Sequence, residues 1–492
     1  MSGDNLSRTV MMTGYWRFID DLHSSLTPNA HRFQATERVR LRVLKRLYGS
    51  FDGAMKRWSS AQLLRASEFV YAMVVLFALT QGPVYRLWSA SANEAFRLPN
   101  PSVSHAEFAT FVALQLPALV LWFRRLDARW LRQSNNVMLT GLLGWLTIGV
   151  MWSTFARHSL PEVVALLLTT AFGLYLATTF SLRQFLYVVA GSMALGVSLS
   201  WLAVMRLWED AVNFQDDYWI GIYYNRNSLA PVTAVAVIVS VWLLVSELGR
   251  RDNGIFKKLL VAVAAPSLAA FAAVELWQSK SRTSPLAMAV AALLTAIWVL
   301  VRLFCQRVKL LNWAVPHSAA ATVSVGALGF FFALRGVGDV LGIADRVPSL
   351  IPRQVLWSLS WSGFLEKPWH GWGWMAAWRT PEFFNADAST WLSAWDSSWA
   401  HNGYHDLLLG GGIVAALLFF FYMWFGIRKV SVQPLATSVP KLLLVVFVLA
   451  AATQESFFIG SHFIWALLVA ALVPSSARTD SVEQQEPDQV ST

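Results

Sequence analysis

The chain has 492 residues, of which 56% are apolar and 14% are charged, and it carries a net charge of +10. A soluble protein of this length has about 25% charged residues, and apolar runs of about 20 residues, enough to cross a bilayer as a helix, recur here. The composition excludes a soluble protein, and the long continuous runs exclude the alternating pattern of an outer-membrane barrel.

Residues 1–65 are polar and basic, and we expect them to form a cytoplasmic tail. The stretch ERVRLRVLKRLYGSF within it is basic and amphipathic, which is typical of a helix on a membrane surface. A solvated tail explains it equally well. The start of the chain lacks a short apolar core beside a small-residue cleavage site, so no removable signal peptide is expected. The one cysteine, Cys305, excludes a disulfide within the chain.

The apolar runs predict an all-α, polytopic membrane protein with about twelve transmembrane helices. The expected spans are 66–82, 108–123, 136–155, 162–180, 184–206, 229–248, 258–277, 284–303, 313–334, 405–427, 438–453 and 456–474. They form a nine-helix membrane region, 66–334, and a three-helix membrane region, 403–474. A long loop, 335–402, separates the two regions, and the polar residues 475–492 are expected to be a disordered cytoplasmic tail.

Charge predicts the orientation of these spans. With both termini in the cytoplasm, the inner loops hold the basic stretches RRLDARWLRQ (124–133) and GRRDNGIFKK (249–258). The outer loops hold the acidic WEDAVNFQDDYW (208–219) and the loop 335–402. Because Lys and Arg concentrate on cytoplasmic loops, the net charge is explained without nucleic acid. The expected location is the bacterial inner (cytoplasmic) membrane, with the active site on the extracytoplasmic face.

Three features of the predicted outer face indicate chemistry. Arg226 and Arg282 are expected on the outer face, where basic residues are uncommon. A lone arginine at a membrane edge, however, often only extends its charged group to the interface. The loop 335–402 holds nine of the chain's 25 tryptophans, more than an interfacial aromatic belt needs. Of these, Trp357, Trp372 and Trp374 are candidates for stacking on sugar rings. His401 lies where the tenth span begins.

These residue types suit group transfer from a lipid diphosphate. An arginine binds phosphate oxygens in pairs through its planar fork, so Arg226 and Arg282 could hold a diphosphate and offset its growing charge. A histidine can take a proton from an attacking hydroxyl at neutral pH, which suits His401. The pattern therefore favours glycosyl transfer from a polyprenyl-diphosphate sugar.

At these positions the sequence resembles the O-antigen ligase and O-antigen polymerase family of bacterial membrane glycosyltransferases. The stretch GIYYNRNSLA (221–230) resembles the family's Asn-Arg/Lys-Asn motif with Asn225, Arg226 and Asn227, and SKSRTSPLA (279–287) resembles its Ser-Arg motif with Arg282. The loop PRQVLWSLSWSGFLEKPWHGWGW (352–374) is similar to its Arg…Trp…Pro…Gly-x-Gly loop, with Arg353 and Trp357. HNGYHDLLLGGGIVA (401–415) resembles its His-Asn-x-Tyr…Gly stretch, with His401, Asn402 and Tyr404.

The resemblance covers about residues 130–470 and implies a metal-independent, all-helical glycosyltransferase of the GT-C-like class, without a cofactor. It implies an undecaprenyl-diphosphate-linked glycan as donor and a lipid or glycan as acceptor. His401 would be catalytic, Arg226, Arg282 and Arg353 would bind the donor, and Asn225, Asn227, Asn402 and Tyr404 would support them. His405, Gly410 and Ala415 depart from the family pattern, which normally has an apolar residue, an acid and a glycine there.

Other functions fit the residues less well. His401 and His405 are four residues apart, as in helical zinc sites, but Asp406 or something distant would have to be the third ligand. Asp216 and Asp217 could bind a divalent metal, although a solvated acidic loop explains them better.

A flippase or exporter of lipid-linked glycans would need charges deep in its spans, and often an internal repeat. A membrane scaffold would not need the Trp-rich loop. The motifs report on the donor and do not separate ligase from polymerase.

Overall fold

The computed structural model describes residues 60–88, 105–126, 130–206, 211–213, 216–250, 253–324, 351–380, 399–458 and 460–473. The chain divides into two units, residues 1–68 and 69–492, and only the start of one helix is described in the first. The predicted surface helix and the C-terminal tail lie outside the described residues, as does half of the loop 335–402, of which residues 351–380 and 399–402 are described.

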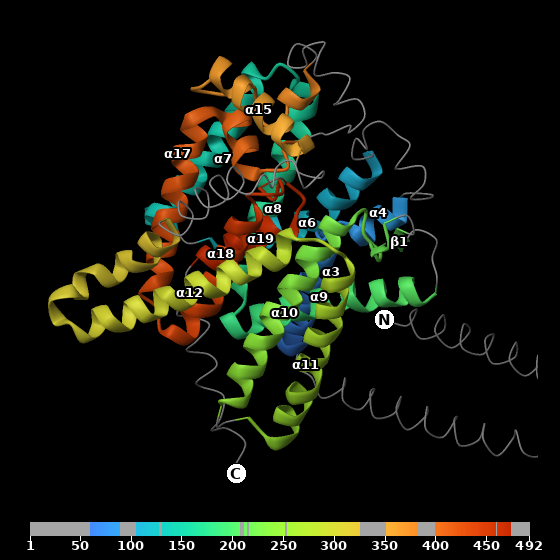
Figure 1. Ribbon diagram of the computed structural model, residues 1–492, viewed down its shortest axis with the longest axis vertical. Helices are drawn as coiled ribbons and strands as arrows, with labels where there is room; N and C mark the ends of the chain where they lie inside the picture. Colours follow the sequence, from blue (N-terminus) through green and yellow to red (C-terminus); the bar gives the residue numbers. More distant parts are fainter. Residues whose placement is uncertain are drawn as a thin grey trace, which may run out of the picture. The chain divides into compact units, whose positions relative to one another are not determined.

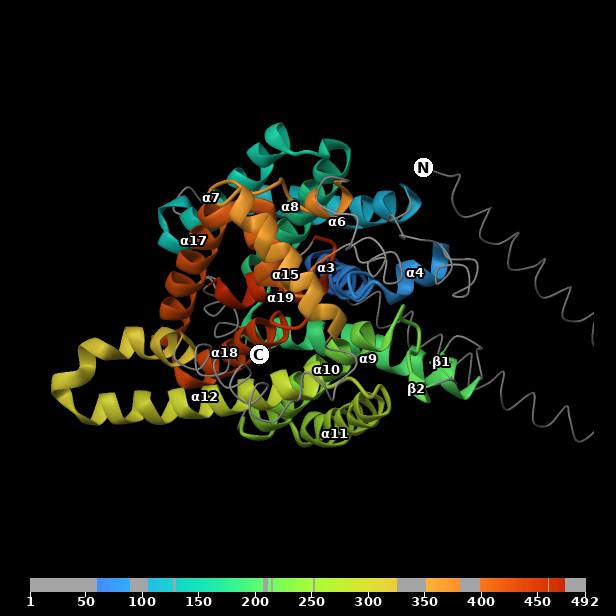
Figure 2. The ribbon, with the colours of Figure 1, turned by 45° about the horizontal axis from the view of Figure 1, so that its top comes forward.

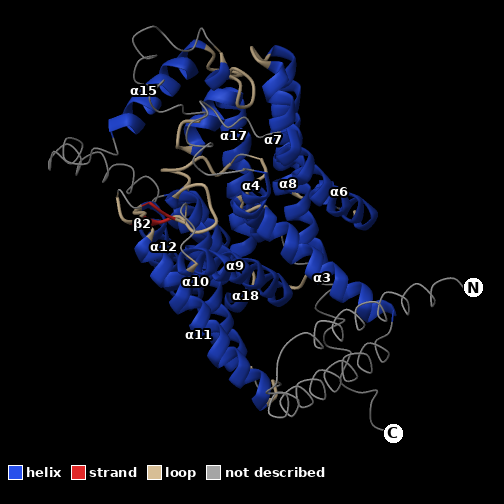
Figure 3. Ribbon diagram, turned by 90° about the vertical axis from the view of Figure 1, so that its right-hand side faces the viewer, coloured by secondary structure: helices blue, strands red, loops and turns tan. Residues whose placement is uncertain are grey.

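The described residues are almost entirely helical (Figures 1 and 3). The α-helices are α3 (Ser60–Ala78), α4 (Gly82–Trp88), α6 (His105–Arg125), α7 (Ser134–Ile148), α8 (Ala156–Thr179), α9 (Leu182–Met205), α10 (Arg226–Leu248), α11 (Ile255–Gln278), α12 (Thr283–Arg307), α15 (Ile351–Glu366), α17 (Gly403–Ser431), α18 (Leu435–Ala451) and α19 (Phe463–Leu472). Short 3₁₀ turns are η1 (Trp130–Arg132), η2 (Gly149–Trp152), η3 (Lys309–Ala314) and η4 (Ala377–Arg379). The strands β1 (Val212–Asn213) and β2 (Tyr218–Trp219) pair antiparallel in one small hairpin.

Seven of the described helices are long and apolar enough to cross a membrane: α6, α8, α9, α10, α11, α12 and α17. The predicted class, an all-α polytopic membrane protein, is confirmed by these helices, while the expected twelve spans stay a prediction. Some expected spans differ in the structure: in 136–155, for example, α7 ends at Ile148 and the 3₁₀ turn η2 follows. Residues 456–474 contain only the ten-residue α19, which is about 15 Å long. The chain before α19 makes turns instead, and these turns carry polar side chains.

Hydrogen bonds fix the relative directions of the helices. Arg302, near the end of α12, donates to the Ser431 carbonyl at 2.8 Å and to Ser438 Oγ at 3.2 Å, so α12 ends where α17 ends and α18 begins. Because α12 packs along α18, the two helices run antiparallel, and α12 starts where α18 finishes. At that end, the Gly403 N–H donates to the Ala452 carbonyl at 2.9 Å. We call this the site end of the helices.

The opposite end carries basic groups from the predicted inner loops. Arg183, at the start of α9, donates to both carboxylate oxygens of Glu247 at 2.6 Å each. Glu247 also accepts from Asn253 at 2.8 Å, and Lys257 Nζ lies 3.5 Å from it. This buried carboxylate therefore ties α9, α10 and α11 together at the end away from the site.

The glycine run 410–412 breaks α17 close to its start. Gly412 has φ 66° and ψ −166°, a backbone conformation that interrupts the helix and that residues with a Cβ rarely adopt. The chain 368–373 pairs with the interrupted segment. The Leu409 and Gly410 carbonyls accept from the Trp372 and Gly373 N–H groups at 2.9 and 3.1 Å, and the Ile413 N–H donates to the Pro368 carbonyl at 2.8 Å. The break is thus stabilised by a loop that satisfies the released backbone groups.

Helix α15 lies beside the start of α17 (Figure 2). Ser360 Oγ on α15 and Nδ1 of His405 on α17 are 2.6 Å apart, and the Trp357 ring stacks on the His405 ring at 6.0 Å. The Trp357 indole N–H donates to the Ala400 carbonyl at 3.0 Å. These contacts fix the part of the Trp-rich loop that carries Arg353 against the segment that carries His401.

Candidate active site

His401 lies in a short turn directly before α17. Its φ of 51° is in the left-handed region, which is uncommon for a residue with a side chain. The next residue, Asn402, caps α17: its Oδ1 accepts from the Tyr404 and His405 N–H groups at 3.0 and 3.3 Å. The Asn402 amide donates to the Thr453 carbonyl at 3.0 Å. Asn402 therefore joins the His401 turn to the chain that follows α18.

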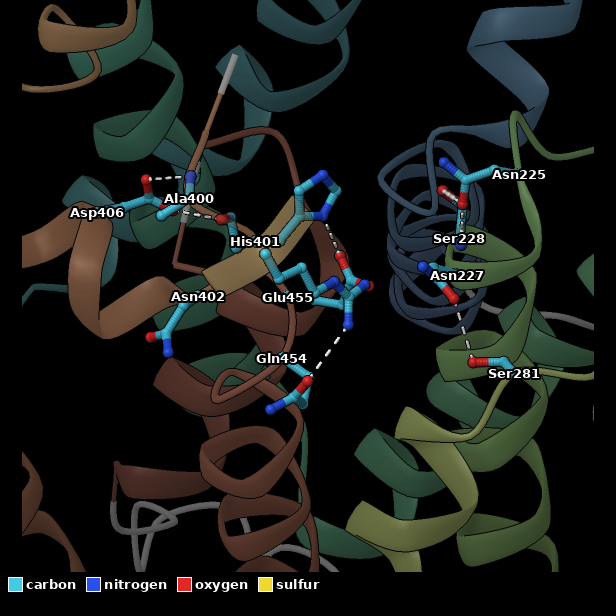
Figure 4. A network of polar contacts seen from close by, with 12 residues as sticks. Asn225, Asn227, Ser228, Ser281, Ala400, His401, Asn402, Asp406, Gln454 and Glu455 are labelled. Carbon is cyan, nitrogen blue, oxygen red and sulfur yellow. Dashed lines mark hydrogen bonds and ion pairs between the residues drawn. The ribbon is translucent and has the colours of Figure 1, made fainter. Parts of the chain in front are cut away.

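His401, Glu455 and Arg353 form one polar cluster. His401 Nδ1–H donates to Glu455 Oε2 at 3.0 Å, and Arg353 Nη2 donates to Glu455 Oε1 at 2.6 Å. Arg353 Nη1 also donates to Gln454 Oε1 at 3.3 Å. The side chains of His401, Glu455 and Arg353 are 21%, 10% and 12% exposed, so the cluster is largely shielded but reachable. Figure 4 shows His401 directed at Glu455.

The sequence analysis missed Glu455 and Gln454. It placed spans at 438–453 and 456–474, which left Gln454 and Glu455 as a minimal link between helices. The structure instead makes residues 452–458 a set of turns at the site end. An acid beside two apolar runs is itself unusual in a membrane protein and marks a functional position, so Glu455 could have been found on that signal.

The two remaining arginines and their asparagines lie at the starts of α10 and α12. Asn225 caps α10 by accepting from the Ser228 N–H at 2.9 Å, and the Ser281 hydroxyl is 3.3 Å from Asn227 Oδ1. Arg226 lies over the Tyr218 ring, 4.8 Å from its centroid. Arg282 is exposed and makes no side-chain hydrogen bond or ion pair with the described residues.

Both groups of residues belong to the site end. Figure 4 shows the Asn225–Asn227 turn with Ser281 on one side of the view and the His401 cluster on the other. The antiparallel packing of α12 and α18 brings the start of α12, with Arg282, to the end where α18 finishes and Glu455 follows. No contact joins Arg226 or Arg282 to His401 among the described residues, so a substrate would have to bridge the two groups.

Tyr404 and two of the tryptophans lie in the protein interior. The Tyr404 hydroxyl donates to the Leu449 carbonyl at 2.9 Å, and its ring packs edge-on against Phe458. Trp372 and Trp374 are only 5% and 1% exposed. Their faces are covered by protein, so the expected stacking of these two rings on a glycan does not fit the structure.

The remaining tryptophans of the loop have different surroundings. Trp357, on α15, is half-buried against the His405 ring, as described above. Trp361 and Trp369 are 49% and 72% exposed. Trp391 and Trp395 lie outside the described residues. Among the described tryptophans of this loop, Trp361 and Trp369 are therefore the most exposed.

Two residues that differ from the family pattern, His405 and Gly410, have close neighbours in the structure. His405 faces Ser360 rather than Glu455, so His401 and His405 do not share a partner, and the described residues contain no group of three His, Cys, Asp or Glu that could hold a metal ion. A Cβ on Gly410 would lie 3.1 Å from the Trp374 ring, which leaves little room for an acid there. Asp217, the other metal candidate, lies 3.4 Å from Lys280 Nζ.

Comparison with known proteins gives one match, which covers part of the chain. None of the curated proteins compared matches the chain. A protein-family model described as O-antigen ligase matches residues 267–420, a segment that contains Arg282, Arg353 and His401 but neither Arg226 nor Glu455. The resemblance to the O-antigen ligase and polymerase family is thereby supported over residues 267–420 of this multi-pass membrane protein, which are similar to the O-antigen ligase family.

Proposed function

We propose that the protein is a membrane glycosyltransferase that moves a glycan from undecaprenyl diphosphate to an acceptor hydroxyl on the extracytoplasmic face of the bacterial inner membrane. The observation that supports this most directly is the His401–Glu455–Arg353 cluster at the site end. It joins a base, an acid and an arginine from three separate parts of the chain. The product class is surface polysaccharide or lipopolysaccharide.

His401 is the general base of the proposed reaction. A carboxylate only accepts hydrogen bonds, so Glu455 holds the proton on Nδ1 of the neutral ring and leaves the lone pair on Nε2. Nε2 takes the proton of the acceptor hydroxyl while the hydroxyl oxygen bonds to the anomeric carbon. Glu455 then stabilises the imidazolium, as a buried carboxylate does in other acid–base pairs.

The bond from the anomeric carbon to the diphosphate oxygen breaks in the same step, and undecaprenyl diphosphate leaves. Arg226 and Arg282 bind the diphosphate oxygens and offset the charge that grows on them. Neither arginine is neutralised by a carboxylate among the described residues, which suits an anion-binding role. Arg353 is paired with Glu455, so in this proposal it orients the carboxylate beside the donor rather than binding the diphosphate alone.

The test uses purified wild-type protein and His401→Ala in detergent, with an undecaprenyl-diphosphate-linked oligosaccharide as the only glycan. Release of undecaprenyl diphosphate and glycan length are both measured. Release by wild type only after a separate acceptor is added supports a ligase. Release with a growing ladder and no added acceptor supports the alternative, a polymerase of lipid-linked units.

Other outcomes contradict the proposal. Equal release by His401→Ala would show that the base is elsewhere. No release with any acceptor would favour the alternative class, a flippase or exporter of lipid-linked glycans. Because the proposed chemistry uses side chains alone, turnover is expected to be unchanged in excess EDTA, and a loss that Mg²⁺ or Mn²⁺ restores would contradict that part of the proposal.

A further inference from the structure

Asp406, in the first turn of α17, is a buried carboxylate that lies between the two catalytic segments. It is 2% exposed, and its Oδ1 accepts from the Ala400 N–H at 2.9 Å and from the Trp378 indole N–H at 3.1 Å. Its Oδ2 accepts from the Ser456 hydroxyl. Both oxygens are therefore occupied by donors from three separate segments.

Those donors adjoin the residues of the proposed reaction. Ala400 directly precedes His401, and Ser456 directly follows Glu455. Trp378 comes from η4, at the end of the loop that pairs with the break in α17. The Asp406 carboxylate thus joins the residue before His401 to the residue after Glu455, and this fixes the distance between the two chain segments. Figure 4 shows Asp406 at Ala400, on the other side of the turn from Glu455.

The turn at His401 needs such an anchor. The left-handed backbone at this residue is unfavourable for a side chain and persists only where its surroundings hold it. Asn402 holds the turn from the C-terminal side, through the cap of α17 and the Thr453 carbonyl. The bond from Ala400 to Asp406 holds it from the N-terminal side.

We propose that Asp406 is a positioning residue for the transfer reaction, one that aligns His401 with Glu455 through Ala400 and Ser456. This rests on the proposed function. Asp406 contacts neither substrate nor the reacting atoms in this proposal. An acid in the first turn of a helix also stabilises the helix dipole, but that role alone predicts altered stability and unaltered turnover.

The experiment compares kcat, donor KM and thermal stability for Asp406→Ala, Asp406→Asn and Ser456→Ala in full-length protein. Asparagine keeps an acceptor oxygen for Ala400 and Trp378 and can donate to Ser456 in reverse, so it is the conservative variant. The matched control is Trp465→Phe, which removes a buried indole hydrogen bond to Thr170, 2.8 Å long, between α19 and α8.

Because misplaced catalytic groups lower turnover rather than binding, Asp406→Ala is expected to lower kcat about 100-fold and Ser456→Ala about tenfold, with donor KM within about twofold. Asp406→Asn is expected to restore kcat to within about tenfold of wild type. Trp465→Phe is expected to lose stability and keep kcat.

If Asp406→Ala does not fold, Ser456→Ala and Asp406→Asn decide. Turnover by Ser456→Ala within twofold of wild type would overturn the assignment. Where Asp406→Ala does fold, an equal loss of kcat in Asp406→Asn and Asp406→Ala at unchanged stability would also overturn it. His401→Ala is measured in parallel. If it retains turnover, the proposed function has failed. If it is inactive while Ser456→Ala is fully active, only the role of Asp406 has failed.

Discussion

Glu455 determines what His401 can do. Its two oxygens have different partners, since one accepts from the histidine and the other from Arg353. A carboxylate shared in this way has few other orientations open to it, so the imidazole that it holds is fixed in both tautomer and direction. The His401 ring is directed toward Glu455, from a residue with left-handed backbone.

Glu455→Gln is expected to lower kcat by about 100-fold or more, because an amide can present its NH₂ to Nδ1 and select the wrong histidine tautomer. It also removes the negative charge that stabilises the imidazolium. Donor KM is expected to change little, since Glu455 does not contact the diphosphate in the proposal. Steady-state release of undecaprenyl diphosphate measures both quantities.

Glu366→Gln is the matched control, because Glu366 ends α15 on the exposed surface and has no hydrogen bond or ion pair among the described residues. It is expected to keep wild-type turnover. A Glu455→Gln protein with wild-type kcat would rule out Glu455 as the partner of the base, whatever the role of His401.

The residues of the site were predictable from sequence where they lie in motifs and not where they lie between helices. The motifs that resemble the family contain His401, Asn402 and Arg353. In the structure these residues lie together against the turns that follow α18. Glu455 was missed because hydropathy assigns its neighbours to spans, and nothing in periodicity distinguishes a turn from a fraying helix end. The burial of Trp372 and Trp374 could not be predicted either, since it depends on the glycine run of α17.

The break in α17 depends on glycines in two segments, the loop 368–373 and the start of α17. Gly371 and Gly373 have φ of 70° and 95°, and a Cβ on Gly371 would lie 2.6 Å from the Gly410 carbonyl carbon. The loop and the helix therefore meet backbone to backbone, without intervening side chains. The glycines of the two segments thus allow both a break in α17 and a close approach of the loop to it.

Gly412→Ala is expected to destabilise the protein by more than about 1 kcal/mol, because φ is 66° and the new Cβ would collide with the Trp369 carbonyl. Displacing residues 368–373 also moves the loop that carries Trp378, so turnover is expected to fall as well. Thermal unfolding in detergent and release of undecaprenyl diphosphate measure the two effects.

Gly144→Ala is the control within a neighbouring helix. A Cβ on Gly144 meets nothing within 4 Å, and the residue is helical. It is expected to raise stability by about 0.5–1 kcal/mol, since alanine favours a helix over glycine. Similar stabilisation in both variants would mean that the loop does not pack on α17 as described.

At the scale of the whole molecule, the helices carry different chemistry at their two ends. The site end holds His401, Glu455 and the starts of α10 and α12, whereas the opposite end holds the Arg183–Glu247 pair and the end of α12 at Arg302. The charge bias predicts this separation, because it assigns the stretch 249–258 to one side and Arg226 and Arg282 to the other. The orientation, with the site end away from the cytoplasm, stays a prediction that rests on the charge bias.

The last prediction tests that orientation with two positions on one helix. Lys280 follows the end of α11 at the site end, with its side chain 48% exposed, and Ile255 begins α11 at the opposite end, 77% exposed. In a Cys305→Ser background, Lys280→Cys is expected to react with a membrane-impermeant thiol reagent added to cells with a permeable outer layer. Ile255→Cys is expected to react only after the inner membrane is opened. The reverse pattern would place His401 and Glu455 in the cytoplasm, where a lipid-linked glycan presented outside could not reach them.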